Sequence, residues 1–139
     1  MLQTAGEEIT GERESPDSLL LMLLQVQNQM KLYHWQTHSH ARHRSTDDFV
    51  TEFAERLDHF VETYQGKYGR IRVGPGIRAI PLQDMGDDAG PATFLRSVAR
   101  FLTHRMPDYL HADRDMDLLN LRDEMLALVN QLQYLFTLR

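Results

Sequence analysis

Apolar residues recur at helical spacing in four stretches of this 139-residue chain, and the pattern predicts an all-α protein. The last stretch, residues 113–138, repeats apolar side chains at alternating intervals of three and four residues, as packed helices of a bundle do. The other expected helices cover residues 16–38, 43–65 and 91–106. In the first of these the apolar residues occupy a wide arc, so we expect that helix to be packed on two sides.

The residues at the ends of these stretches agree with the helical pattern. Ser15, Pro16 and Asp17 form a typical helix start, with a capping residue, a proline in the first position and an acid in the first turn. The connection of residues 39–42 is short, so the second helix should run antiparallel to the first. We expect Gly66 to end that second helix.

Residues 69–90, between the second and third helices, contain five glycines and two prolines and show no clear period. We expect a long irregular crossover, in which residues 77–80 are the one candidate strand. A loop of this length in a compact domain is usually functional or part of an interface. Four helices with one long crossover are the topology of ferritin-like bundles among others, so a ferritin-like four-helix bundle is the predicted fold.

Residues 1–14 are polar, partly acidic and without a period, so we expect a flexible acidic tail before one domain of residues 15–139. The formal net charge of −5 disfavours nucleic acid as the main partner. No apolar run is long enough for a membrane span or a signal peptide, which agrees with a cytoplasmic location. Because the chain has no cysteine, nitrogen and oxygen atoms would have to hold any metal.

Four residues of metal-ligand type lie on one side of the expected second helix: His43, Asp47, Asp58 and Glu62. At about 100° per residue they fall within an arc of about 100°, away from the apolar arc of the same helix. Asp47 and Asp58 are separated by roughly 16 Å along the axis, so one helix cannot bring both to a single ion. An antiparallel copy related by a two-fold axis can do so, and the spacing therefore predicts a metal centre shared between two subunits.

Further histidines surround this pattern. His34, followed by Trp35, lies near the end of the first helix and is another candidate ligand. His34 and His38 form a His-x-x-x-His pair, which at a helix end is more often a cap or a surface pair than a metal site. We interpret His38, His40 and His59 as surface residues or neighbours of the site. The size of Trp35 favours a place in the hydrophobic core over a redox role.

This constellation resembles the metal-centre signature of the Dps-family mini-ferritins. In that family a His-Trp pair closes one helix, and the next helix carries a His, an Asp four residues on, an Asp eleven further and a Glu four further. His43, Asp47, Asp58 and Glu62 match that helix without a gap, whereas the connection from His34 is shorter than in the family.

A second resemblance concerns the residues at both ends of the motif. Residues 34–39 and 61–70 are similar to uncharacterised ferritin-like proteins of large DNA viruses, which bring no settled activity with them. The motif itself covers residues 34–62, and the four-helix pattern covers most of the chain.

The resemblance to the Dps family implies a ferroxidase centre at a two-fold interface. His34, His43 and Asp47 would come from one chain, and Asp58 and Glu62 from the other. The implied reaction is oxidation of Fe(II) by hydrogen peroxide or oxygen, with storage of the ferric product and protection from oxidative damage. Imidazole and carboxylate ligands suit iron, as a single ion or as a di-iron pair, and also Zn or Mn.

The resemblance also carries implications for partners and for the tryptophan. It implies a homo-oligomer, and in the family a dodecamer, whereas the spacing alone supports a two-fold dimer. Trp35 beside the site would donate an electron or quench a radical. We do not expect DNA binding, because the tail of residues 1–14 contains no lysine and the chain is acidic.

Two other functions compete with the mini-ferritin hypothesis. The first is a non-enzymatic helical-bundle dimer, with a structural metal or none, that acts as an interaction module. The second is a metal-dependent hydrolase, which would need three converging histidines, and His104 and His111 lack a suitable spacing. The chain has no Glu-x-x-His motif, which argues against a centre within one subunit. Asp117, Asp123 and Glu124 should face solvent or a pore.

Overall fold

The computed structural model describes residues 15–86 and 89–139, and the expected tail of residues 1–14 lies outside them. In this part of the chain there are four α-helices and no strand, so the predicted all-α class is confirmed and residues 77–80 are irregular. The helices are α1 (Pro16–Gln36), α2 (His40–Tyr68), α3 (Ala89–Arg100) and α4 (Met116–Leu135).

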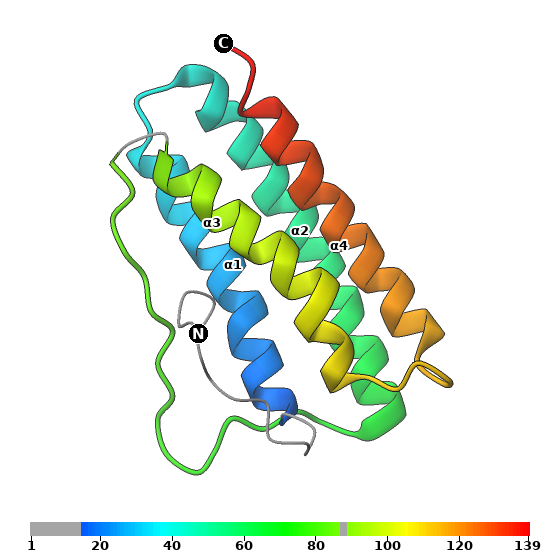
Figure 1. Ribbon diagram of the computed structural model, residues 1–139. Coiled ribbons are helices and arrows are strands. Elements are labelled where there is room, and N and C mark those ends of the chain that lie inside the picture. The colour runs from blue at the N-terminus through cyan, green and yellow to red at the C-terminus, as the bar shows by residue number, and fades with distance from the viewer. Residues whose placement is uncertain (1–14, 87–88) are drawn as a thin grey trace.

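The four helices pack side by side (Figure 1). Helix α2 lies between α1 and α4, and α3 completes the group by packing against α1 and α4. Helices α1 and α4 are therefore diagonal to each other. The segment after α2 returns along the outside of α1 to the end of the molecule where α2 began, so α2 and α3 run in the same direction. No helix in the described ranges is both long and apolar enough to cross a membrane.

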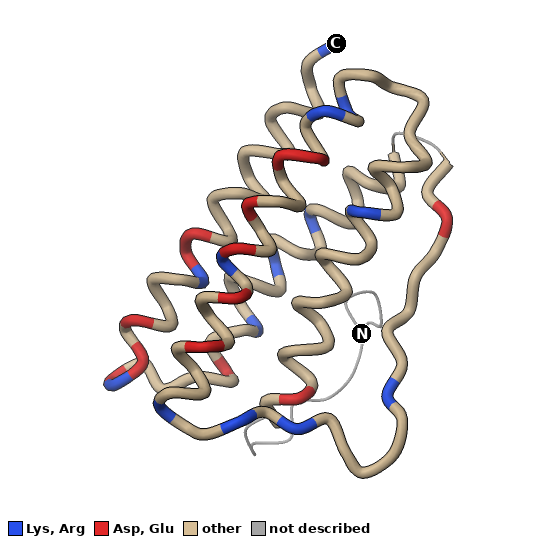
Figure 2. Tube along the Cα trace, turned by 180° about the vertical axis from the view of Figure 1, so that it is seen from behind, with Lys and Arg blue, Asp and Glu red and all other residues tan. Residues whose placement is uncertain are grey.

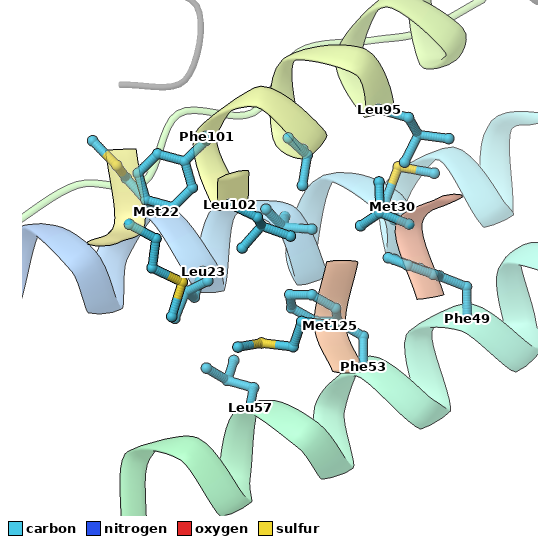
Figure 3. Packing of buried hydrophobic residues seen from close by; sticks show 14 of the residues in the cluster. Met22, Leu23, Met30, Phe49, Phe53, Leu57, Leu95, Phe101, Leu102 and Met125 are labelled. Atoms are coloured by element: carbon cyan, nitrogen blue, oxygen red, sulfur yellow. The ribbon is translucent and has the colours of Figure 1, made fainter. Parts of the chain in front are cut away.

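The interior is filled by apolar side chains from all four helices (Figure 3). Met30 of α1, Phe53 of α2, Leu95 of α3 and Met125 of α4 are each completely buried. Burying a side chain of this size contributes about 1.5–3 kcal/mol relative to leaving it in water. The apolar periods of the sequence thus converge on one continuous core.

Helix α1 is packed on two sides, as its wide apolar arc predicts. One side faces the core, and the other faces the crossover segment. Gln29 Nε2 donates to the Gln83 carbonyl at 2.9 Å, and the Gln83 N–H donates back to Gln29 Oε1 at 3.1 Å. At the end of α1, the Met85 N–H donates to Gln36 Oε1 at 3.1 Å, and the Met85 side chain is buried. These bonds fix the end of the crossover on α1.

The short connection between α1 and α2 differs in detail from the expectation. Helix α1 ends at Gln36 and α2 begins at His40, three residues earlier than predicted. Ser39 causes the early start, because its hydroxyl accepts a hydrogen bond from the Arg42 N–H at 3.2 Å and so caps the helix. At the start of α1, Ser15 does occupy the capping position, but its hydroxyl bonds the Asp17 carboxylate and no backbone N–H.

Helix α2 ends at Tyr68 and is capped by Gly69, so the predicted end at Gly66 is wrong. Gly66 lies inside the last turns of the helix. Gly69 has a φ of +87°, a left-handed conformation that costs glycine little, and its N–H donates to the Gln65 carbonyl at 2.9 Å. The crossover therefore starts at the residue that can reverse the chain.

The third helical region is longer and less regular than the predicted helix of residues 91–106. A π-helical turn (Phe101–Arg105) and a 3-10 turn (Met106–Tyr109) follow α3. Pro107 lies at the start of the 3-10 turn. Because proline has no N–H and its ring clashes with the preceding turn, the α-helical hydrogen bonds cannot continue through it.

Candidate metal centre

Two histidines from different helices form a stacked pair at the α1–α2 connection. The His34 ring, near the end of α1, and the His43 ring, in the first turns of α2, lie 3.9 Å apart with an angle of 17° between their planes. His34 Nδ1 is 2.7 Å from the His43 carbonyl oxygen, and His43 Nδ1 is 2.9 Å from the His34 carbonyl oxygen. Because a carbonyl only accepts, each Nδ1 carries a proton, so in the neutral form of either ring the lone pair is on Nε2.

Thr46 supports the assignment of a proton to Nδ1 of His34. Its side chain is fully buried, and its hydroxyl donates to the Arg42 carbonyl at 2.6 Å. The same oxygen lies 3.1 Å from His34 Nδ1 and accepts the second branch of that N–H. His34 is thus held in one tautomer by two acceptors from α2.

The Nε2 atoms of this pair remain open. Neither makes a hydrogen bond with the described residues. The His34 ring is mostly buried, yet within residues 15–86 and 89–139 the one buried side-chain polar atom without a partner is Gln25 Oε1. His34 Nε2 therefore reaches solvent. A metal-binding histidine is normally held in this way, with its other ring nitrogen donating to a backbone carbonyl.

The three predicted carboxylate ligands lie on the exposed side of α2. Asp47 follows His43 by one turn, whereas Asp58 and Glu62 are near the other end of the helix. None of the three makes a hydrogen bond or an ion pair with the described residues. Because α2 is unbroken from His40 to Tyr68, Asp47 and Asp58 stay roughly 16 Å apart along it.

A single copy of the chain therefore brings together only part of the predicted site. His34 and His43 are in contact, with Asp47 on the same face as His43. Among the described residues, no group of three or more histidines, aspartates and glutamates is placed to hold a metal ion. The centre shared with a second copy stays a prediction.

Trp35 is on the surface, and the expectation of a core position is wrong. Its side chain is 67% exposed. The residue before it, His34, points toward α2, so the next position on α1 points outward. The Lys31 ammonium lies 5.3 Å from the centre of the indole ring, in a cation–π contact.

The remaining histidines of this region agree with the surface interpretation. His38, His40 and His59 are exposed. His34 and His38 are not a helical pair, because α1 ends at Gln36.

In α4, Asp117, Asp123 and Glu124 are exposed as predicted, and each forms an ion pair. Their cationic partners are Lys67 at 2.8 Å, Arg122 at 2.8 Å and Arg56 at 3.2 Å.

A buried carboxylate that the sequence does not reveal lies at the other end of α2. Asp115 has no exposed side-chain surface. It accepts hydrogen bonds from Tyr68 Oη at 2.5 Å, the His111 N–H at 2.7 Å and Lys67 Nζ at 2.9 Å. Burial acts to raise the pKa of Asp115, but these three donors outweigh it and lower the pKa to about 2. The only signal in the sequence was its place just before α4, where an aspartate reads as an ordinary helix cap.

The hydrogen bond to Asp115 also raises the pKa of Tyr68. The pKa of Lys67 is raised by its hydrogen bonds to Asp117 and to Asp115. Every member of this network is paired with another, so it joins the end of α2 to the start of α4 and offers no open ligand position.

Comparison with protein-family models gives one match, to a family of unknown function, DUF5856, over residues 34–136. The matched region begins at His34 and includes all of α2, α3 and α4. No curated protein and no solved structure matches the chain.

Proposed function

The chain belongs to DUF5856, a family of unknown function, and we propose that it is a Dps-like mini-ferritin that binds and oxidises Fe(II). The observation that carries this proposal is the His34–His43 pair. Both rings are fixed through Nδ1, and both Nε2 lone pairs are open at the surface. Two neutral imidazole nitrogens held in this way are ready ligands for a divalent metal ion.

The proposed centre is completed by a second copy of the chain. In an antiparallel pair of α2 helices, Asp58 and Glu62 of one copy approach His43 and Asp47 of the other. The exposure of all three carboxylates supports this assignment, because a second copy can reach them. Carboxylates stabilise Fe(III) more than Fe(II), because their attraction for a metal ion increases with its charge.

In this proposal iron is the substrate and the cargo. Asp58 and Glu62 bind the first Fe(II), Glu62 can bridge to a second, and His34 and His43 complete the site. Each Fe(II) gives up one electron, so two ions together reduce one hydrogen peroxide to water, and oxygen is the alternative acceptor. The Fe(III) is hydrolysed and stored as ferric oxide. Zn and Mn suit the same ligand types.

Two features support a ferritin-like bundle and a homo-oligomer. The long crossover lets α2 and α3 run in parallel, a connection that ferritin-like bundles use. Trp35 exposes a large aromatic surface beside the histidine pair, and aromatic residues are enriched in interfaces. A two-fold dimer is the smallest assembly that forms the centre, and a dodecameric shell is the extended form. We place the protein in the cytoplasm and do not propose DNA binding.

The test is Fe(II) oxidation by hydrogen peroxide or oxygen, followed by absorbance of the ferric product. The variant Asp58→Ala with Glu62→Ala removes the acidic half of the centre. Asp123→Ala with Glu124→Ala, on α4, is the matched control because it also removes two exposed carboxylates. We expect the first variant to fall to the protein-free rate and the control to keep the wild-type rate. Equal rates for wild type and the first variant would refute the ferroxidase proposal.

The alternative function is a helical dimer with a structural metal or none, which acts as an interaction module. One observation favours it: Asp47, Asp58 and Glu62 lack the supporting hydrogen bonds that metal-binding carboxylates usually have. Under this alternative, Zn²⁺ raises the melting temperature of the wild type or leaves it unchanged, and the wild type oxidises Fe(II) no faster than buffer. Iron oxidation above background that depends on Asp58 would exclude it.

A further inference from the structure

A groove of about 130 Å³ lies between α2 and α4. Its lining is half apolar and half polar, and it includes two carboxylates, Asp48 and Glu52, which are exposed and make no ion pair with the described residues. A cavity of about 150 Å³ can hold a benzene molecule, so the groove has space for one aliphatic side chain. The lining residues are Ser45, Asp48, Phe49, Glu52, Leu128, Gln131, Leu132 and Leu135.

The crossover has the complementary character. Residues 69–83 include three arginines and no aspartate or glutamate. Arg70 and Arg72 make no hydrogen bond or ion pair with the described residues. Ile77 is fully exposed, and Val73 is 39% exposed. Aliphatic side chains with cations beside them are complementary to a groove that is lined by leucine and phenylalanine side chains and by carboxylates.

The crossover cannot reach the groove of its own chain. Arg78 forms an ion pair with Asp17, and Gln83 is bound to Gln29, so the segment is held against α1. Helix α1 is diagonal to α4, and Figure 1 shows the crossover on the side of the molecule away from α4. Figure 2 shows several basic positions along the crossover and one acidic position near its end, whereas most acidic positions lie on the helices, where basic positions are also found.

We infer that the crossover of one copy docks in the α2–α4 groove of a neighbouring copy. Ile77 packs against the apolar side chains of the groove, and Arg70 and Arg72 pair with Asp48 and Glu52. The two surfaces are different, so the contact is head-to-tail and continues from copy to copy until a ring or shell closes. The proposed metal interface, by contrast, joins two identical surfaces and ends at a dimer. The docking goes beyond the proposed function and does not require bound iron.

A cross-linking experiment tests the docking directly, because the chain has no cysteine of its own. One tagged chain carries Arg72→Cys, a second chain carries Glu52→Cys, and a short bismaleimide joins thiols that lie close together. We expect a covalent pair of the two chains on a denaturing gel. The matched control replaces Glu52→Cys by Thr93→Cys, an exposed position on α3, and should give little product. Equal yields from both mixtures would overturn the docking.

Exchange of charges tests the pairing itself. Either Arg72→Glu or Glu52→Arg alone places like charges at the contact, and we expect the dissociation constant of the larger assembly to rise at least about tenfold. The two changes in one chain restore opposite charges and should recover most of the affinity. Mass photometry at several concentrations measures this. Failure of the double variant to recover would contradict the proposed pairing.

The aliphatic anchor has its own test. Ile77→Asp should reduce the assembly to dimers, whereas Met116→Asp, at another exposed apolar residue, should leave its size unchanged. A wild-type protein that stays monomeric or dimeric at micromolar concentration would refute the docking. The Asp58→Ala and Glu62→Ala variant should still give the cross-link, so a failure of the metal centre and a failure of the docking can be told apart.

Discussion

The two ends of α2 hold polar side chains in opposite ways. At the first end, His34 and His43 use one ring nitrogen each for mutual support and keep the other open to solvent. At the far end, Asp115 is completely buried and its oxygens are occupied by Tyr68, Lys67 and the His111 N–H. Burial and hydrogen bonding alone therefore do not mark a functional site, because the buried Asp115 has both and keeps no open ligand position. The open lone pair distinguishes a ligand from a structural group.

The largest expected effect comes from the closed end. Asp115→Ala leaves the Tyr68 hydroxyl, the Lys67 ammonium and the His111 N–H without their acceptor, which should cost about 2–4 kcal/mol of unfolding free energy. Asp58→Ala, an exposed aspartate on α2, should change stability by less than about 0.5 kcal/mol. Urea denaturation of both variants measures the difference, and equal losses would show that Asp115 is not a structural centre.

Acidification should remove the contribution of the Asp115 charge to stability. The pKa of Asp115 in the folded protein is about 2, below the ordinary aspartate value of 3.8, so its charge stabilises the fold above pH about 4. This contribution is lost as the pH falls through about 2. The difference in unfolding free energy between wild type and Asp115→Asn should be constant near neutral pH and shrink between about pH 4 and pH 2. A difference that grows on acidification would contradict the lowered pKa.

The open end should show a smaller effect on stability and a specific effect on metal binding. His34→Phe keeps an aromatic ring against His43 but removes the N–H that the His43 carbonyl accepts, at a cost of about 1–2 kcal/mol. We expect Zn²⁺, used as a probe, to raise the melting temperature of the wild type and not of this variant. His59→Phe, at an exposed position of α2, is the control and should keep the Zn²⁺ response.

The smallest effect on stability is expected from an exposed ion pair between the two ends of α2. Arg56 of α2 and Glu124 of α4 form an ion pair at 3.2 Å, with both side chains more than a third exposed. Such pairs contribute roughly 0–1 kcal/mol, because water screens them and the side chains lose freedom. Arg56→Ala should therefore lie within that range in urea denaturation and should become indistinguishable from wild type at high salt. A loss of unfolding free energy as large as that of Asp115→Ala would contradict the expectation that exposed ion pairs contribute little to stability.

Much of the fold follows from the sequence because helix formation depends on local patterns. The apolar periods predict all four helices, and the glycines and prolines predict the irregular crossover. The boundaries were less accurate, because caps depend on individual hydrogen bonds. Ser39 caps α2 early, and Gly69, not Gly66, has the left-handed backbone at its end.

Only the part of the candidate site that depends on local sequence could be predicted. The spacing of His43, Asp47, Asp58 and Glu62 places them on one exposed face of α2 from the sequence alone. The mutual bonds of the histidine pair depend on how far α1 and α2 slide past each other, which no local pattern gives. Asp115 was missed for a similar reason, since its Tyr68 partner is 47 residues away in the chain and on another helix.

The unbroken length of α2 has a consequence for how the proposed dimer would fill. His43 and Asp58 are held roughly 22 Å apart along the axis, so the two centres of one antiparallel pair have about the same separation. That distance exceeds the Debye length of about 8 Å at physiological ionic strength. Occupation of one centre therefore leaves the affinity of its twin unchanged. Binding of the first Fe(II) at each centre should follow a simple hyperbola, with a Hill coefficient of about one.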